Sequence, residues 1–353
     1  MIPSLPAPGS PLASRIGLTE RVFAGPRMRR LLGAVDDGLA QVEAKLAVEL
    51  RVTDALADAT SRYLYEAGGK RVRPLLTVLT AQLGQGVTPH VVAGATALEM
   101  THLGSLYHDD VMDASDVRRG VPSAHVVWGN NVAILAGDLL FSRASQLMAQ
   151  IGERAIRLQA DTFERLVLGQ MHETVGAQPD DDPVEFYLRV LADKTGSLIS
   201  AAAQAGVLFS DAPAEYAGPV LEYGEKVGIA FQLLDDVIDL SADPEVTGKV
   251  PGTDLRAGVP TMPYLLLSRS GDEASLALKD VIDDGVARIA DGADPAVLDD
   301  ALDRLRAHEA TERTRRLAVD WSVEAVAALA PLPDGPVRDA LTRFAQVVVD
   351  RSS

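Results

Sequence analysis

Three kinds of residue are scarce in this 353-residue sequence, and each shortage narrows the class of protein. There is no cysteine, which excludes disulfides and thiolate chemistry and suits a reducing cytoplasm. Basic residues number 33 against 50 acidic ones, and the net charge of -17 argues against a nucleic-acid partner, because general binding to nucleic acid needs a basic face. Aromatic residues make up only 5% of the chain, whereas alanine and leucine are abundant, which favours helices over strands.

Long apolar runs and strand patterns are also missing. No apolar run reaches the length of a membrane span, so we expect membrane contact to be peripheral at most. Residues 1–25 are rich in proline, serine and glycine and lack the pattern of a signal peptide, which predicts a mobile tail. With no alternating pattern longer than a few residues and no linker in mid-chain, we expect residues 26–353 to form one all-α domain, a single large helical bundle.

Apolar periodicity and glycine or proline stops predict where the helices lie. We expect a soft interruption near Gly129 and a break at Thr195-Gly196, with a loop over residues 120–123. The expected helices cover roughly residues 27–50, 53–67, 74–83, 90–113, 125–151, 153–175, 184–209, 213–240, and 263 to the end with short interruptions.

One expected helix carries the acidic motif Asp109-Asp110-Val111-Met112-Asp113. On a helix, Asp109 and Asp113 lie one turn apart on the same face, with Asp110 beside them. Carboxylates so close repel one another, which leaves two interpretations: an exposed acidic face, or a site for a cation. The preceding turns are apolar, so this helix enters a core and a compensating ion is favoured. Mg²⁺ fits carboxylates that also hold substrate phosphates.

The same spacing recurs far downstream, in Asp235-Asp236-Val237-Ile238-Asp239, again behind an apolar turn. Two such motifs are much stronger evidence than one. The simplest geometry has two helices facing each other across a cavity, each offering carboxylates to a shared metal cluster.

Basic residues accompany the acidic motifs. Lys70 and Arg73 lie three residues apart at an expected helix start, where backbone N–H groups also favour anions. Arg118 and Arg119 follow the first acidic motif closely. Arginine can grip a phosphate with two hydrogen bonds, and lysine binds it as a point charge. Acidic and basic residues side by side indicate a metal together with a bound polyanion.

These motifs together resemble the trans-isoprenyl diphosphate synthases, the polyprenyl synthetase family. The resemblance has its motifs in register from about Tyr63 to Pro263 and continues more loosely to the C-terminus. It implies an isoprenoid-synthase bundle around a central cavity, and it also implies a homodimer. The implied reaction is head-to-tail prenyl transfer, in which isopentenyl diphosphate attacks the carbocation that an allylic diphosphate forms. The implied cofactor is Mg²⁺, with three ions when substrate is bound.

The resemblance also assigns roles to single residues. Asp109, Asp113 and Asp235 are the expected direct metal ligands. The remaining motif residues, Asp110, Asp236 and Asp239, bind metal directly or through water. Isopentenyl diphosphate is assigned to Lys70, Arg73, His102 and Arg119.

The allylic substrate is assigned to Arg118 and Lys194, with Thr195 near the growing cation, Gln232 as a further family position, and Lys249 in a loop that is a plausible lid. The residues expected to act in catalysis are Asp109, Asp113, Arg118, Lys194, Asp235 and Lys249. The sequence departs from the family at Val259, where a lysine is common, and we expect this to weaken an outer contact only.

Product length is the finer question. The side chains one, two and three turns before Asp109 are Ser105, Thr101 and Leu98, with Gly104 beside Ser105. In short-product relatives a large aromatic residue at the first level acts as a floor, whereas Gly104 and Ser105 are small. We therefore expect an open tunnel and a product longer than geranylgeranyl, suited to a quinone side chain. The alternative is a farnesyl or geranylgeranyl product, if a neighbouring helix, such as the one with Phe163, or a dimer partner supplies the floor.

Two other classes of protein share part of this pattern. Terpene cyclases are also all-α metal-dependent enzymes, but they normally lack the basic stretch for a second diphosphate, and Lys70, Arg73 and Arg119 argue against them. The silent subunit of a heteromeric synthase is the non-catalytic alternative. Such subunits typically lose acidic residues, and here both motifs are intact.

Overall fold

The computed structural model describes residues 25–240 and 251–350, and most of them are helical. The first half contains α2 (Pro26–Glu49), α3 (Ala55–Glu66), α4 (Val72–Thr80), η1 (Ala81–Leu83), α5 (Pro89–Met112), β1 (Val117–Arg118), β2 (Val121–Pro122), α6 (Ala124–Trp128), α7 (Asn130–Ile151) and α8 (Glu153–Val175). The second half contains α9 (Pro183–Leu191), η2 (Ala192–Gly196), α10 (Ser197–Phe209), η3 (Ala214–Tyr216), α11 (Ala217–Asp239), α13 (Thr253–Arg256), α14 (Met262–Ser268), α15 (Glu273–Ala290), η4 (Pro295–Leu298), α16 (Asp299–Arg306), α17 (Glu309–Ala328) and α18 (Pro336–Asp350).

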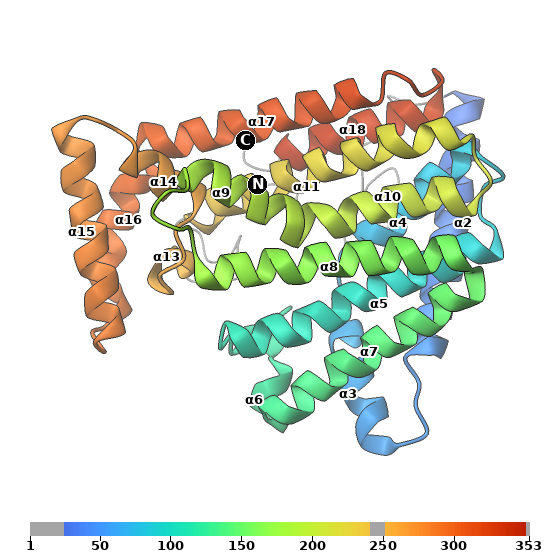
Figure 1. Cartoon of the computed structure of the whole chain (residues 1–353), viewed down its shortest axis with the longest axis horizontal. Coiled ribbons are helices and arrows are strands. Elements are labelled where there is room, and N and C mark those ends of the chain that lie inside the picture. Colours follow the sequence, from blue (N-terminus) through green and yellow to red (C-terminus); the bar gives the residue numbers. More distant parts are fainter. Residues whose placement is uncertain (1–24, 241–250, 351–353) are drawn as a thin grey trace.

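The long helices lie side by side as a bundle (Figure 1). Helices α4, α5, α10 and α11 form its centre, where α10 packs against both α4 and α11. Helix α7 packs on α5 at one side, and α17 with α18 covers α11 at the other. Helices α15 and α16 stand at one end, beyond α14 (Figure 1). The all-α bundle expected from the sequence is confirmed.

Local sequence signals explain where several helices begin and end. Proline occupies the first turn of α2, α5 and α9, where its missing N–H costs nothing. The side chains of Thr88 and Asp182 cap α5 and α9 by accepting backbone N–H bonds. Gly129 has a φ of 84° and separates α6 from α7, as expected. Helix α8 has the bounds predicted for it, residues 153–175.

The centre of the bundle is apolar but is pinned by two hydroxyl groups. Thr77 and Thr80 of α4 each donate a 2.8 Å hydrogen bond to a backbone carbonyl of α10, at Ala202 and Ala203. Both threonines are fully buried, so these bonds satisfy groups that would otherwise be costly inside a core. They fix α4, which begins within the basic stretch, against α10, which directly follows Lys194-Thr195-Gly196.

Two local features differ from the expectation. Residues 117–122 form a two-stranded antiparallel ribbon around Arg119 and Gly120, instead of an irregular loop. Residues 192–196 form a π-helical turn, so α9 continues into α10 without the expected break at Thr195-Gly196. Both features turn out to carry residues of the candidate site.

Helix α7 is long and apolar enough to cross a membrane by length and composition, the one such helix among the described residues, although the sequence predicted none. Buried helices of bundles meet the same criterion. Helix α7 contacts α3, α5, α6 and α8 and is only partly buried. Its position is therefore that of a bundle helix, whose exposed residues include Ile134 and Leu135 beside polar ones such as Asp138 and Gln146.

Candidate active site

The first acidic motif lies at the C-terminal end of α5. Asp110 is fully buried and accepts a 2.6 Å hydrogen bond from Nε of Arg118, which reaches it from the β1–β2 ribbon. Asp113 is the exposed C-cap residue, and Asp109 is partly buried one turn earlier. The three carboxylates thus face different surroundings, and only Asp110 is neutralised by a direct arginine partner in the structure's hydrogen bonds.

Asp109 bears an electrostatic cost that a cation would relieve. Burial raises its pKa from 3.8 to about 6, Asp113 adds to the rise, and Lys194 and Arg118 oppose it. Within the described ranges, no cluster of three or more His, Cys, Asp or Glu side chains is arranged to hold a metal unaided.

The second acidic motif lies at the C-terminal end of α11. Asp235 and Asp239 are partly buried, whereas Asp236 is only 2% exposed. The Asp236 carboxylate accepts hydrogen bonds from Tyr187 Oη, at 2.9 and 3.1 Å, and from the backbone N–H of Met262 at 3.1 Å. Burial raises the pKa of Asp236 well above its usual range. In this geometry Asp236 joins α9, α11 and α14, and its carboxylate faces these partners.

Lys194 lies on the π-helical turn, close to the first motif. Its ammonium group is paired with Glu173 of α8. Burial lowers the pKa of Lys194, but Glu173, Asp109 and Asp113 together raise it above its ordinary value, so the side chain is a stable cation. Burial, with Asp236 adding to it, raises the pKa of Tyr187 well above its usual range. The pair formed by Lys194 and Glu173 is therefore electrostatically coupled to the first acidic motif.

Neighbouring helices hold this π-helical turn closely. Arg165 of α8 donates from Nε to Asp193 at 2.8 Å and from Nη2 to Glu225 of α11 at 2.7 Å. A Cβ atom on Gly169 would lie 2.5 Å from the backbone nitrogen of Lys194, so only glycine permits the contact between α8 and the turn. Thr195 Oγ1 lies 3.3 Å from Gln232 Oε1, which brings two predicted residues together. Such π-turns are frequent at functional sites.

A second group of predicted residues gathers around the basic stretch. Arg119, from the ribbon, donates hydrogen bonds to the backbone carbonyls of Leu64 and Gly68. A Cβ on Gly69 would lie 2.9 Å from the Arg119 guanidinium, so glycine is needed for this approach. Burial lowers the pKa of Arg73 to about 10, with Glu99 opposing and Arg119 adding to the effect, and the group stays charged at neutral pH. Burial and the nearby arginines hold the pKa of His102 well below 6.5, so its ring is neutral.

The structure thus brings most predicted residues into two adjoining groups. The first contains the acidic motifs with Lys194, Thr195 and Gln232, and the second contains Arg73, His102 and Arg119, with Lys70 exposed at its edge. Lys249 lies outside the described residues, as do residues 1–24 of the predicted tail. Sequence reasoning missed Glu173, Arg71 and Glu99, because their partners lie on other helices and no local spacing announces them.

The predicted chain-length residues lie in a tighter setting than expected. Leu98 and Thr101 are buried in the core, and Ser105 is partly buried. A Cβ on Gly104 would lie 3.0 Å from the Phe141 ring of α7. Phe141 in turn meets Phe163 of α8 with ring centroids 4.7 Å apart. Aromatic rings thus lie beside Gly104, and they come from neighbouring helices.

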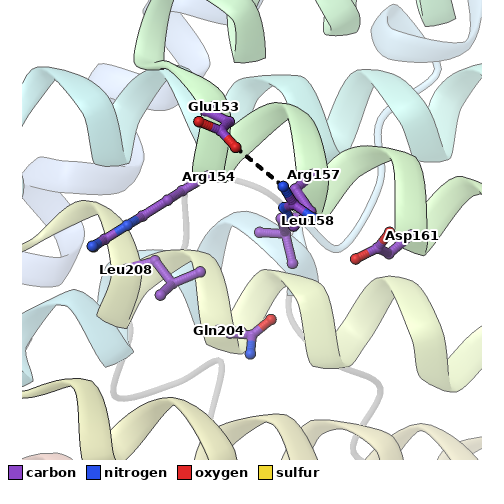
Figure 2. A pocket seen from close by; sticks show the side chains of 7 residues that line it. All are labelled: Glu153, Arg154, Arg157, Leu158, Asp161, Gln204 and Leu208. Carbon is purple, nitrogen blue, oxygen red and sulfur yellow. Dashed lines mark hydrogen bonds and ion pairs between the residues drawn. The ribbon is translucent and has the colours of Figure 1, made fainter.

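A pocket of about 280 Å³ between α8 and α10 lies apart from these groups (Figure 2). Its lining includes Arg157 and Glu153, which pair with each other and are 72% and 87% exposed. None of the predicted site residues lines it. It is a surface pocket with exposed charged walls, and the candidate site remains at the helix ends described above.

Acidic motifs on two helix ends, a lysine coupled to the first of them, and a separate arginine cluster define a class of enzyme that handles diphosphates with divalent metal ions. A sequence profile of the polyprenyl synthetase family matches residues 54–293. Nonaprenyl diphosphate synthase of Mycobacterium tuberculosis is 44% identical over 337 residues, which cover 95% of this chain and 96% of that protein. Octaprenyl diphosphate synthase of Escherichia coli is 35% identical over 317 residues, covering 89% and 95%.

Solved structures agree with the sequence matches. The polyprenyl synthase of Caulobacter crescentus, complexed with calcium and isoprenyl diphosphate, is 31% identical and superposes with a TM-score of 0.83 over 92% of this chain and 98% of that one. The chain belongs to the polyprenyl synthetase family. It is an enzyme, a prenyltransferase of isoprenoid biosynthesis, and dependence on a divalent metal is typical of its family. The resemblance noted from the motifs is confirmed.

Proposed function

We propose that this enzyme adds isopentenyl diphosphate units head-to-tail to an allylic diphosphate, using Mg²⁺, and releases a long-chain all-trans polyprenyl diphosphate for a quinone side chain. The observation that carries the proposal is the division of charge in the site. Lys194 is coupled to Asp109 and Asp113, whereas Arg73 and Arg119 form a separate cationic group. Two cationic groups suit two diphosphates, one of which must leave while the other stays.

The residues divide the work accordingly. Asp109, Asp113 and Asp235 would hold Mg²⁺, three ions when both substrates are bound, and the metal would neutralise the allylic diphosphate as it leaves. Lys194 and Arg118 donate hydrogen bonds to that diphosphate and stabilise the charge it develops.

Arg73, Arg119 and Lys70 fix isopentenyl diphosphate, and the neutral ring of His102 can donate to it without adding charge. The released diphosphate accepts the final proton, since the reaction needs no protein base.

Product length is supported from two sides. The names of the nonaprenyl and octaprenyl relatives favour a long product, and the small side chains of Gly104 and Ser105 leave no bulky group on α5. A shorter product is the second candidate, because Phe141 packs directly against Gly104 and Phe163 lies behind it. We favour the long product, since a partly buried pair on two helices can move aside more easily than a residue fixed in the core.

We further propose that the enzyme is a homodimer in the cytoplasm, paired through α7 and α8. These two helices pack together, and each carries exposed apolar side chains. Their exposed large apolar side chains are Ile134, Leu135, Ile156, Val167, Leu168, Met171 and Val175. Monomeric soluble proteins rarely leave so many apolar side chains together in water, and a symmetric partner would cover them.

The proposed reaction is tested by incorporation of labelled isopentenyl diphosphate into lipid-soluble product, with geranyl, farnesyl and geranylgeranyl diphosphates as primers. We expect incorporation with Mg²⁺ and its loss after chelation, with recovery when Mg²⁺ is restored. The same assay without primer is the control. Incorporation that persists in excess chelator, or that needs no allylic primer, would contradict the proposed reaction.

A further inference from the structure

Arg71 lies between two residues assigned to isopentenyl diphosphate, Lys70 and Arg73, yet its own side chain points into the protein. The side chain is only 3% exposed. Nε donates to Glu43 of α2 at 2.6 Å, and Nη1 donates to Glu99 of α5 at 3.2 Å. The same guanidinium also donates to the backbone carbonyls of Gly68, at 3.2 Å, and Tyr65, at 3.3 Å, and stacks 4.9 Å from the Tyr65 ring centroid. Hydrogen-bond acceptors of the protein thus surround the Arg71 guanidinium, which leaves it bound within the protein.

The backbone at Arg71 is strained, which indicates that its contacts hold it in place. Its φ is +52°, in the left-handed region that residues with a Cβ seldom adopt. The preceding glycines, Gly68 and Gly69, also have positive φ values of 96° and 143°. Three of the four residues 68–71 thus have positive φ, which gives this loop a sharp course that local sequence preference alone does not fix. The hydrogen bonds from the Arg71 guanidinium to Glu43 and Glu99 hold this loop against α2 and α5.

Glu99 is the acidic counterpart of this arrangement. It is 1% exposed, and its Oε2 has no hydrogen-bond partner within residues 25–240 and 251–350. Burial lowers the pKa of Arg73 and of Arg119, and the Glu99 charge opposes this at both, as it does at Arg71, with which it forms an ion pair at 3.2 Å. Because like charges repel, three arginines gathered without a counter-ion would move apart. Glu99 is placed to keep them together when no diphosphate is bound.

We infer that Arg71 and Glu99 are positioning residues for isopentenyl diphosphate, which set the spacing between Arg73 and Arg119 without touching the substrate. The inference rests on the proposed function of that arginine group. A planar fork with four acceptors can do this, and a lysine with the same charge cannot, since it presents a single point of attachment. Position, and not charge alone, is therefore what Arg71 supplies.

Arg71→Lys separates position from charge. In steady-state kinetics we expect the KM for isopentenyl diphosphate to rise about tenfold, while kcat and the KM for the allylic substrate change less than about twofold, because the reacting centre itself is intact. Glu99→Gln should act in the same direction, and the double variant should be about as impaired as the worse single variant, since both remove one linked contact. Arg62→Lys, which alters an arginine paired with two carboxylates on α3, is the matched control and should behave as the wild type.

Each outcome decides a distinct point. In folded Arg71→Lys, an unchanged KM for isopentenyl diphosphate overturns the inference, and so does a fall in kcat as large as the rise in that KM. If Arg71→Lys does not fold, Glu43→Gln removes a partner whose side chain is 34% exposed, and it should raise the same KM about threefold; no rise overturns the inference. Arg73→Ala tests the underlying function separately. If that variant binds isopentenyl diphosphate normally, the assignment of the arginine group fails as well.

Discussion

Removing the Asp109 carboxylate should stabilise the metal-free protein while it destroys activity. Because the folded-state pKa of Asp109, about 6, lies above the ordinary 3.8, the folded protein holds more protons between these values than the unfolded chain. Its unfolding free energy therefore falls as the pH rises through this window. The difference between the two pKa values corresponds to about 3 kcal/mol of unfolding free energy at neutral pH. Relaxation around a partly exposed group reduces the stabilisation expected from removing the carboxylate to about 1–3 kcal/mol.

Asp109→Asn tests this arithmetic in a thermal unfolding assay. In chelator at pH 7.5 the variant should unfold about 2–5 °C above the wild type, and the two should converge near pH 4. With Mg²⁺ and inorganic pyrophosphate the order should reverse, since binding to the folded state stabilises the wild type more. Asp320→Asn, an exposed change on α17, is the control and should alter neither result. A variant that unfolds below the wild type in chelator would refute the reasoning.

Three further predictions follow from single contacts. Asp236→Asn should lower the free energy of unfolding by about 1–3 kcal/mol, because it disturbs buried hydrogen bonds. It should change the Mg²⁺ dependence of kcat less than about threefold, whereas Asp235→Asn should abolish turnover. Equal kinetic losses in the two variants would make Asp236 a metal ligand. Gly169→Ala should lower kcat about tenfold by pushing the backbone of Lys194 away, and normal kinetics would show that the turn tolerates movement. Leu168→Glu should convert the dimer to monomers in sedimentation, and a wild type that is already monomeric at micromolar concentration would exclude the proposed pairing.

The sequence predicted the helices and the acidic motifs well because both depend on local spacing. Asp109 and Asp113 share a face on any helix. Gly129 ends α6 because it adopts a positive φ, which glycine does without steric cost. The ribbon at Arg118 and Arg119 was missed because its two-residue strands are too short to alternate.

The surroundings of the site depend on long-range packing and could not be read from local pattern. Glu173 finds Lys194 only when α8 packs on the π-helical turn, and Arg71 finds Glu99 only when the loop meets α5. The direction of the Asp236 carboxylate likewise depends on Tyr187 from another helix. The approach of Phe141 to Gly104 likewise depends on how α7 packs against α5.

The length of the product tests the central claim most directly. Wild-type enzyme is incubated with excess isopentenyl diphosphate, farnesyl diphosphate and Mg²⁺, and the products are dephosphorylated and sized by chromatography beside those of Ser105→Phe. We expect the wild type to make chains longer than geranylgeranyl and Ser105→Phe to stop much earlier, with the first condensation within about threefold of normal, because a ring on α5 blocks growth and spares the metal site. A wild type that stops at geranylgeranyl diphosphate or earlier would contradict the account and would place the floor at Phe141 and Phe163.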